Sequence, residues 1–545
     1  YRGKTKCNSC NGSRLRADAD YVKINNKSIS EINRMAISDA TLFFKALKLN
    51  SEDQKIAKRI IDEINSRLSY LKDVGLGYLT MERASNTLSG GESQRINLAT
   101  SIGSSLVGSM YILDEPSIGL HPRDSLRLIE VLKKLRDVGN SVIVVEHDEE
   151  MMKSADMIID IGPYAGRHGG EVVFKGNHSE LVKASKSLTA KYLTGQFKIE
   201  VPKVRRKPKD FIIIEQAYLH NLQNITVKIP LNQICVVTGV SGSGKSTLIG
   251  KILHTFLERF FLTGLVKASH CNDIKMNFDL VSGVEYINQN PIGKSSRSNP
   301  ITYTKGYDDI RQLFASEKHA KAKGFKPGYF SFNVDGGRCE KCQGEGQLTI
   351  SMQFMADVHL KCDECDGKRF KEEVLEVKFK GKNISQVLEM TVEESLDFFN
   401  EDNTLCKKIK AKIFALSEVG LEYVQLGQAS NTLSGGEAQR IKLASFLSHN
   451  KSKQKKLFIF DEPTTGLHFH DVKKLIKALQ DLVEMGHHVV IIEHHMDIIK
   501  SADWIVDLGP EGGDKGGTLV FEGSPESFVK SKVLSPTKDH LKEYI

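Results

Sequence analysis

The chain has 545 residues, 40% of them hydrophobic, and a formal net charge of +8. This length predicts two to four domains, and this composition is typical of a folded globular protein. The sequence contains no apolar run near the roughly 20 residues that span a bilayer, which predicts no membrane partner and a cytoplasmic location. The mild positive charge permits nucleic acid as a partner without requiring it.

Residues 1–84 combine a Cys7-x-x-Cys10 pair with a helix expected from about Glu52 to Asp73. The helix places five apolar side chains on one stripe, which predicts that they pack into a core. These are Ile56, Ile60, Ile64, Leu68 and Leu71. We interpret the segment as the tail of an inserted zinc-bearing domain and the chain as the C-terminal part of a longer protein, in which the metal-binding partners of the cysteine pair would precede Tyr1.

Residues 85–195 carry three motifs that return in residues 429–545. They are a Leu-Ser-Gly-Gly-Glu segment, an Asp-Glu-Pro segment after an apolar run, and a Glu-His pair. Asp114 and Asp461 are 347 residues apart, so the repeat predicts duplicated domains rather than a solenoid of short units. The candidate site residues of the first copy are Ser89, Gly90, Gly91, Asp114, Glu115 and His147.

Residues 196–211 form the predicted linker between the two copies and contain a basic run from Lys203 to Lys209. Proline and like charges keep such a run open, so a solvated linker is the simplest interpretation. Contact between this run and DNA is the less favoured alternative.

Residues 212–294 contain a phosphate loop, from Gly239 to Thr247, between an apolar strand and a predicted helix. The backbone N–H groups of such a loop wrap phosphates, and the helix N-terminus favours negative charge. Lys245 is predicted to reach the β- and γ-phosphates of ATP, and Ser246 to bind Mg²⁺. The loop occurs once, so the chain contains one and a half ATPase modules. The predicted nucleotide-binding residues of this segment are Gly239, Ser241, Gly242, Gly244, Lys245, Ser246, Thr247 and Gln289.

Residues 295–428 form a second predicted zinc-bearing insertion. Two pairs, Cys339-x-x-Cys342 and Cys362-x-x-Cys365, are nineteen residues apart and predict a tetrahedral Cys₄ site for Zn²⁺. A closed Cys₄ site has no open coordination position, which favours a structural ion. The basic residues around the pairs fit a DNA-facing surface and a solvated surface equally. The isolated cysteines are predicted to act as small hydrophobic residues; they are Cys235, Cys271 and Cys406.

Residues 429–545 are predicted to complete the second core, an α/β unit with a mostly parallel sheet. Asp461 and Glu462 follow an apolar run, and α/β sheets bind ligands at the carboxyl ends of their strands. We expect Asp461 to hold Mg²⁺ directly or through water, and Glu462 to act as general base for hydrolysis. His494 ends the next apolar run and is placed to sense the γ-phosphate. The second Ser-Gly-Gly segment supplies Ser434, Gly435 and Gly436 as further candidates.

These motifs together resemble the ABC ATPase family, in which the Ser-Gly-Gly signature of one half closes over the phosphate loop of the other. The resemblance implies two ABC-type cores, the first incomplete, with one composite ATP site in which Ser89 and Gly91 face Lys245. The second signature would face Asp114, the predicted catalytic Glu115 and His147. No phosphate loop accompanies that set, so it should bind nucleotide poorly.

Three further segments resemble the UvrA family of the bacterial excinuclease: residues 117–121, 287–304 and 330–342. The resemblance implies a homodimeric ATPase of nucleotide excision repair that binds lesion-bearing double-stranded DNA and delivers it to UvrB. Recognition would depend on duplex deformation, and lysine and arginine contacts to phosphates would supply affinity. In that family the UvrB-binding module and the first phosphate loop precede the point where this chain begins, so UvrB docking is not expected here.

Two alternatives stay open at this stage. A UvrA-like paralogue of drug or toxin resistance would lack the UvrB-binding insertion, so the sequence preceding Tyr1 would distinguish it. A membrane-transporter ATPase is the other alternative. The inserted Cys₄ module and the fusion of two halves without a membrane segment argue against it.

Overall fold

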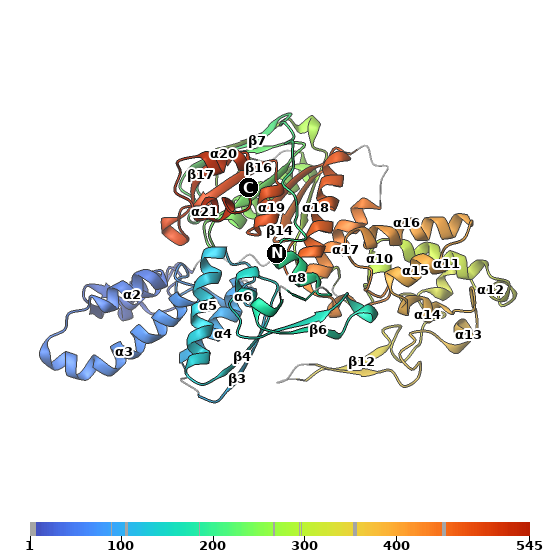
Figure 1. Cartoon of the computed structure of the whole chain (residues 1–545), viewed down its shortest axis with the longest axis horizontal. Helices are drawn as coiled ribbons and strands as arrows, with labels where there is room; N and C mark the ends of the chain where they lie inside the picture. The colour runs from blue at the N-terminus through green and yellow to red at the C-terminus, as the bar shows by residue number, and fades with distance from the viewer. Residues whose placement is uncertain are drawn as a thin grey trace.

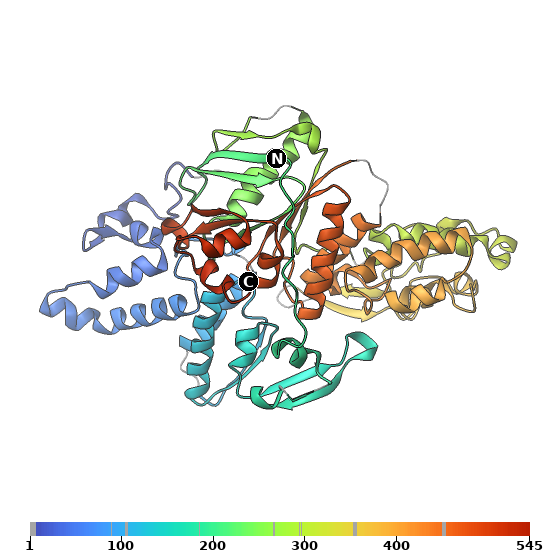
Figure 2. The ribbon, with the colours of Figure 1, turned by 45° about the horizontal axis from the view of Figure 1, so that its top comes forward.

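The computed structural model describes residues 7–88, 90–103, 107–181, 183–184, 186–264, 267–293, 295, 297–352, 357–448 and 454–545. Two α/β cores lie against each other at the centre, and an arm of helices projects from each in opposite directions (Figures 1 and 2). We refer to residues up to 195 as the first half and to residues from 212 as the second half. The α/β class and the inserted arms are those predicted from the sequence.

The second core contains a six-stranded sheet in the order β11-β14-β15-β9-β16-β17, parallel except for β17. Its central strands are apolar on both faces because each face meets its own core. Ile234 and Val236 of β9 enter the core formed with helices, whereas Cys235 and Val237 enter the core formed with a second, antiparallel sheet. The strands are β9 (Ile234–Thr238), β11 (Val284–Ile287), β14 (Leu457–Asp461), β15 (His488–Ile492), β16 (Trp504–Gly509) and β17 (Thr518–Gly523).

The antiparallel sheet has the order β10-β7-β8 and covers one face of the six-stranded sheet. Its strands are β7 (Phe211–Ala217), β8 (Ile225–Pro230) and β10 (Asp273–Lys275). The helices of the second core are η4 (Thr247–His254), α9 (Thr255–Thr263), α17 (Gly435–Leu447), α18 (Phe469–Glu484), α19 (Met496–Ser501), α20 (Pro525–Lys530) and α21 (Pro536–Leu541).

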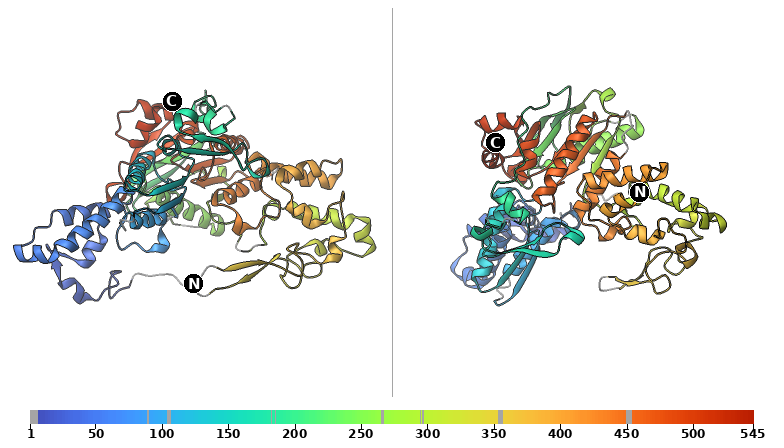
Figure 3. Two further views of the ribbon diagram at one scale, coloured as in Figure 1. Left: turned by 60° about the horizontal axis from the view of Figure 1, so that its bottom comes forward. Right: turned by 45° about the vertical axis from the view of Figure 1, so that its right-hand side comes forward.

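The second arm consists of short helices and a two-stranded hairpin that extends below them (Figure 3). The helices pack around buried phenylalanines, among them Phe314, Phe330 and Phe332. The elements are α10 (Pro300–Tyr303), α11 (Gly306–Ser316), α12 (Lys318–Ala322), β12 (Gln347–Ile350), β13 (Val358–Lys361), α13 (Glu372–Leu375), α14 (Ile384–Glu389), α15 (Val392–Phe398) and α16 (Thr404–Glu418).

The first half repeats this plan with fewer strands. In the described residues its core has two separate strand pairs, parallel β3-β4 and antiparallel β5-β6. Its elements are β1 (Lys23–Ile24), β2 (Lys27–Ser28), α1 (Ile29–Arg34), α2 (Ile37–Lys45), α3 (Ser51–Asp73), α4 (Gly90–Gly103), β3 (Met110–Asp114), α5 (Pro122–Asp137), β4 (Ser141–Val145), α6 (Glu149–Lys153), β5 (Ile158–Gly162), β6 (Glu171–Gly176), α7 (His178–Leu181) and α8 (Leu188–Leu193).

One apolar face of the first core is open to solvent. Ile112 of β3 is 69% exposed and Val145 of β4 is 50% exposed, whereas their counterparts Ile459 and Ile492 are fully buried. The difference follows from β9, which lies between β15 and β16 and brings the antiparallel sheet with it. Nothing in the described part of the first half occupies the corresponding place between β4 and β5.

The apolar stripe of α3 is only partly a core stripe, which corrects the sequence prediction. Leu68 is buried, and Ile64 and Leu71 pack against the same cluster. Ile56 and Ile60 are 78% and 61% exposed. Helix α3 has 23 residues, and its N-terminal part extends past the helices α2 and α4 that it contacts (Figure 1).

The basic linker is also more ordered than a solvated run. Arg205 donates to the Ala502 carbonyl over 2.8 Å and pairs with Glu526 at 2.7 Å. Arg206 pairs with the buried Asp503 at 3.2 Å. The prediction of an open linker therefore fails at these two arginines, because the second half presents a carbonyl and two carboxylates to them.

We predict that Arg205→Ala lowers the free energy of unfolding by about 1–2 kcal/mol, because hydrogen bonds to a largely buried charged group are lost. Urea denaturation of the variant measures this effect. Lys203→Ala removes an exposed charge from the same run and should change stability by less than about 0.5 kcal/mol. Equal effects of the two substitutions would contradict the docking role of Arg205.

Candidate nucleotide site and Cys₄ centre

The phosphate loop lies at the carboxyl end of β9 and leads into η4. Gly239, Gly242 and Gly244 all have positive φ angles, and a Cβ on Gly239 would lie 1.9 Å from the Leu508 carbonyl oxygen. Only glycine fits there. The Lys245 ammonium donates to the carbonyls of Gly239 and Val240 over 2.9 and 3.0 Å, and burial lowers its pKa. Ser246 and Thr247 follow at the start of η4, as the predicted strand–loop–helix arrangement requires.

The two predicted acids follow β14. Asp461 accepts a hydrogen bond from the Tyr286 hydroxyl at 2.8 Å, and burial raises its pKa. Glu462 has a φ of +47°, an uncommon angle for a residue with a side chain. Burial, followed by the nearby Asp461 and Glu493 carboxylates, raises the pKa of Glu462. A carboxyl with a raised pKa is a stronger base than an ordinary glutamate.

His494 is the second residue of the loop after β15 and is 6% exposed. Glu493 accepts the backbone N–H of His494 at 2.6 Å and that of Thr464 at 3.0 Å, which ties this loop to the one that follows Glu462. Burial holds the pKa of His494 well below its usual value, so its ring is neutral at pH 7.

The first half contributes directly to this site. The Ser241 hydroxyl donates to the Gly119 carbonyl over 3.1 Å. A Cβ on Gly119 would lie 3.1 Å from the Glu462 carboxylate, and one on Gly242 would lie 2.6 Å from the Tyr78 ring. The segment 117–121 and Tyr78 therefore line the phosphate loop from the opposite half. Neither was predicted as a site feature, although Gly119-Leu120-His121 does repeat as Gly466-Leu467-His468.

The first signature motif adjoins the same segment. Gly91 lies in the first turn of α4, where a Cβ would be 2.7 Å from the Ile118 carbonyl oxygen. Gly90 begins that helix, and Ser89 lies outside the described residues. The structure thus brings Gly91 into the shell of residues around segment 117–121.

The first-half carboxylates form a mirror arrangement. Glu115 follows β3 with a φ of +45°, and a Cβ on Gly466 would lie 3.0 Å from its carboxylate. Burial, then Glu146 and Asp114, raises the pKa of Glu115 to about 6. His147 Nε2 lies 3.8 Å from the Glu115 carboxylate.

The second signature motif lies against its own half. Ser434 caps α17 by accepting the backbone N–H of Glu437, and a Cβ on Gly435 would lie 3.1 Å from the Gln289 side chain. Gln289 in turn donates to the Thr465 hydroxyl over 2.9 Å. A Cβ on Gly436 would lie 2.6 Å from the Thr465 carbonyl oxygen, so all these groups surround the segment that follows Glu462.

The four predicted cysteines converge in the second arm. Their sulfur atoms all lie within 4.8 Å of one another, with Cys339 to Cys362 at 3.9 Å and Cys342 to Cys365 at 3.6 Å. Tetrahedral Zn²⁺ with sulfur ligands at about 2.3 Å requires sulfur separations near 3.8 Å, so the cluster fits the ion. It is the only such group in the described part of the chain. The isolated cysteines are buried as predicted: Cys235, Cys271 and Cys406.

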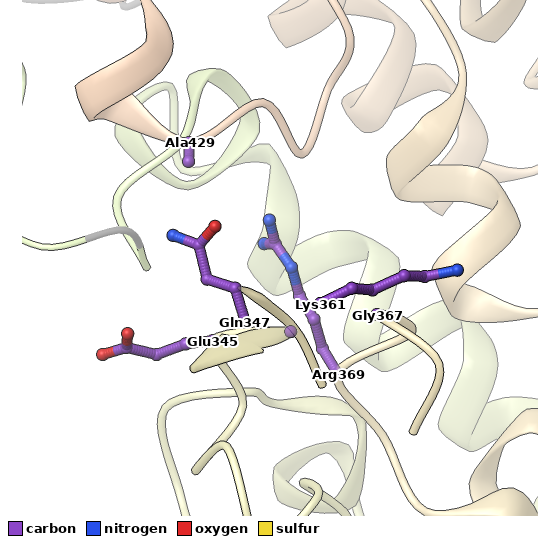
Figure 4. A pocket seen from close by; sticks show the side chains of 7 residues that line it. Glu345, Gln347, Lys361, Gly367, Arg369 and Ala429 are labelled. Atoms are coloured by element: carbon purple, nitrogen blue, oxygen red, sulfur yellow. The ribbon is translucent and has the colours of Figure 1, made fainter. Parts of the chain in front are cut away.

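The basic side chains near the Cys₄ cluster are mostly paired. Lys341, Lys361 and Lys371 form ion pairs with Asp363, Asp366 and Glu340. A hollow beside the cluster is lined by Arg369 and Lys361 together with Glu345 and Gln347 (Figure 4). Arg369 is anchored there by donating to the Gly427 carbonyl over 3.1 Å.

The chain is similar to curated proteins over its whole length. It is 52% identical to the UvrABC system protein A of Clostridium perfringens over 552 residues. The matched region covers 100% of this chain and 57% of that protein. It is 51% identical over 546 residues to the UvrABC system protein A of Staphylococcus aureus strain MRSA252, with the same coverage. The chain belongs to the UvrA family. A comparison with protein-family models finds no match.

Among solved structures, UvrA2 from Deinococcus radiodurans matches the chain with a TM-score of 0.89 and 38% identity, over 98% of this chain and 66% of that one. The UvrA fold therefore includes both halves and both arms. This UvrA-family chain spans little more than half the length of the curated relatives it matches. Within its described residues, no helix is both long and apolar enough to span a membrane.

We predict that the chain binds one zinc ion and that Cys362→Ser loses it, because three thiolates and a hydroxyl are a poorer ligand set. Atomic absorption measures the metal, and hydrogen exchange should show weaker protection in residues 295–428. Cys271→Ser is the matched control, since Cys271 is buried outside the cluster and its loss should leave the zinc content unchanged. One zinc per chain in Cys362→Ser would contradict the assignment.

Proposed function

We propose that this chain carries the ATP-dependent DNA-damage recognition of a UvrA protein in nucleotide excision repair. The observation that carries the proposal is the composite site, in which Gly119 of the first half contacts Ser241 and Glu462 of the second. In a site built from both halves, nucleotide binding is coupled to the arrangement of the halves, because closure of the halves and occupation of the site depend on each other.

In the proposed site, the N–H groups of the phosphate loop and Lys245 hold the phosphates of ATP, while Ser246 and Asp461 hold Mg²⁺. When bound, Mg²⁺ neutralises the charge that develops on the phosphates. Glu462 accepts the proton of the attacking water, and its raised pKa suits that role. The neutral His494 donates a hydrogen bond toward the γ-phosphate. Gln289, Ser89 and Gly91 complete the site when the halves close.

We further propose that the second arm faces DNA. Lys368 is exposed beside the Cys₄ cluster, whereas the neighbouring Lys361 is paired with Asp366. The hairpin β12-β13 carries Ile350, Val358 and Leu360, each 40–49% exposed. Lysine contacts to phosphates would give affinity, and deformability of the damaged duplex would give selectivity.

Homodimer formation belongs to the same proposal. Delivery of damaged DNA to UvrB belongs to it for the full-length family protein, whose UvrB-binding module precedes the part that this chain spans. The similarity to proteins named UvrABC system protein A supports them. The 52% identity over the whole chain to a protein of that name supports the excision-repair assignment.

We predict that Glu462→Gln slows ATP turnover by at least about 10²-fold, because an amide cannot accept the water proton. ATP binding should persist, since the phosphate loop is untouched. Steady-state turnover and nucleotide titration measure the two effects. Glu543→Gln alters an exposed glutamate near the C-terminus and should leave both unchanged. Unchanged turnover in Glu462→Gln at saturating ATP would reject the assigned role.

We predict that lesion-bearing duplex DNA changes the ATP turnover of this chain more than undamaged duplex of the same sequence does, at one stated salt concentration. The affinity should fall steeply with salt because phosphate contacts release counterions. Turnover that is identical with damaged DNA, undamaged DNA and no DNA would contradict damage sensing by this chain.

A matched pair of variants tests the DNA-facing arm. Lys368→Ala should weaken binding to both duplexes and reduce the slope of log K against log salt by about one, whereas Lys361→Ala should change the slope less because its charge is already paired. Equal slopes for Lys368→Ala and the unmodified chain would place the DNA elsewhere.

A further inference from the structure

Two histidines occupy equivalent places at the junction of the halves. His121 precedes α5 and His468 precedes α18, and each ring caps its helix. In both, Nδ1 accepts a backbone N–H over 3.2 Å, from Arg123 and from His470. An acceptor nitrogen carries no proton, so the neutral ring has its proton on Nε2.

The Nε2 proton of His121 points into the other half. His121 Nε2 lies 3.2 Å from the Thr537 hydroxyl of α21, and Thr537 donates to Asp507 of β16 over 3.1 Å. Ser535 donates to the other oxygen of Asp507 over 2.6 Å. All these side chains are at most 3% exposed. The chain of bonds therefore has one direction, from ring to hydroxyl to carboxylate, across the contact between α5 and α21 (Figures 1 and 2).

The same network occurs with the halves exchanged. His468 Nε2 lies 3.2 Å from the Thr189 hydroxyl, Thr189 donates to Asp160 over 3.0 Å, and Ser187 donates to the second oxygen of Asp160 over 2.6 Å. Two copies with the same atoms and nearly the same distances show that the network belongs to the repeated unit.

The clamped ring lies against the histidine that faces the nucleotide. The His121 and His494 rings meet edge to face, with centroids 5.9 Å apart and an interplanar angle of 86°. His494 Nδ1 is buried and has no hydrogen-bond partner among the described residues. That nitrogen does not orient the ring, so contact with His121 is a restraint on its orientation. The mirror pair is His147 and His468, at 6.4 Å and 82°.

We propose that His121, clamped by Thr537 and Asp507, is a positioning residue that acts from the first half to hold the His494 ring toward the γ-phosphate. The inference rests on the proposed ATPase function and adds a route by which the contact between the halves reaches the nucleotide. Loss of this positioning should weaken the binding of ATP but not of ADP, because only ATP carries the γ-phosphate toward which the His494 ring is held.

Thr537→Val tests the clamp with little change in shape. The variant removes both hydrogen bonds of the hydroxyl, the one with His121 and the one with Asp507. The affinity for the magnesium complex of the ATP analogue AMP-PNP should fall about fivefold relative to ADP, and kcat should fall similarly. The affinity for ADP should stay the same. Thr537→Ser keeps the hydroxyl and should restore both values to within about twofold. An unchanged AMP-PNP to ADP ratio and kcat in Thr537→Val would overturn the proposal.

Thr189→Val is the matched control, since it removes the same two hydrogen bonds in the mirror network, where the sequence has no phosphate loop. It should change the ratio by less than twofold, and an equal loss would show general weakening of the contact, which overturns the proposal. His121→Asn keeps the acceptor that caps α5 but cannot reach Thr537, so it provides a second test if Thr537→Val does not fold. It should reproduce the fivefold loss, and a normal ratio would also overturn the proposal.

These readouts separate the inference from the damage-sensing proposal. Turnover that ignores DNA lesions rejects damage sensing while leaving the effect of Thr537→Val intact. A chain that binds neither nucleotide rejects the nucleotide site, and the inference with it.

Discussion

The contact between segment 117–121 and the phosphate loop is the constraint on which the rest of the molecule depends. Gly119 can approach Glu462 and Ser241 closely because it has no side chain, and two residues later His121 meets Thr537 of α21. At this site the second half supplies the phosphate loop and its carboxylates, and the first half supplies segment 117–121 and the signature helix behind it. Chemistry at such a site is sensitive to small movements of one half against the other.

The two halves show how the same motifs behave in different surroundings. Asp461 and Glu462 end a strand that is buried on both faces, whereas Asp114 and Glu115 end a strand whose Ile112 is largely exposed. Glu115 nevertheless keeps the unusual φ angle and the raised pKa of its counterpart. The local geometry of the acid pair therefore survives where β9 has no equivalent among the described residues, because the flanking turn and the facing glycine of the other half are both present.

In the second arm, the cysteine cluster and the charged side chains around it form separate sets of contacts. The Cys₄ cluster has its own small apolar surroundings, and the lysines on its surface are mostly neutralised by neighbouring acids. Surface ion pairs of this kind contribute little to stability, so the predicted zinc would be the stronger restraint on the segment around the cluster. An arm built in this way can present a few free cations at fixed positions.

The amino-acid sequence alone predicts the positions of those groups whose spacing along the chain reflects their chemistry. The phosphate loop, the carboxylates at strand ends and the two cysteine pairs were all placed correctly in the fold, because each depends on residues close together or on the end of one strand. The domain boundaries and the catalytic roles stay predictions. Tertiary structure alone decided that Ile56 and Ile60 are exposed, that Arg205 and Arg206 dock, and that His121 meets Thr537 from 416 residues away. A periodic apolar pattern or a run of charges does not determine which surface of the protein it will contact. That contact depends on how distant segments of the chain pack together.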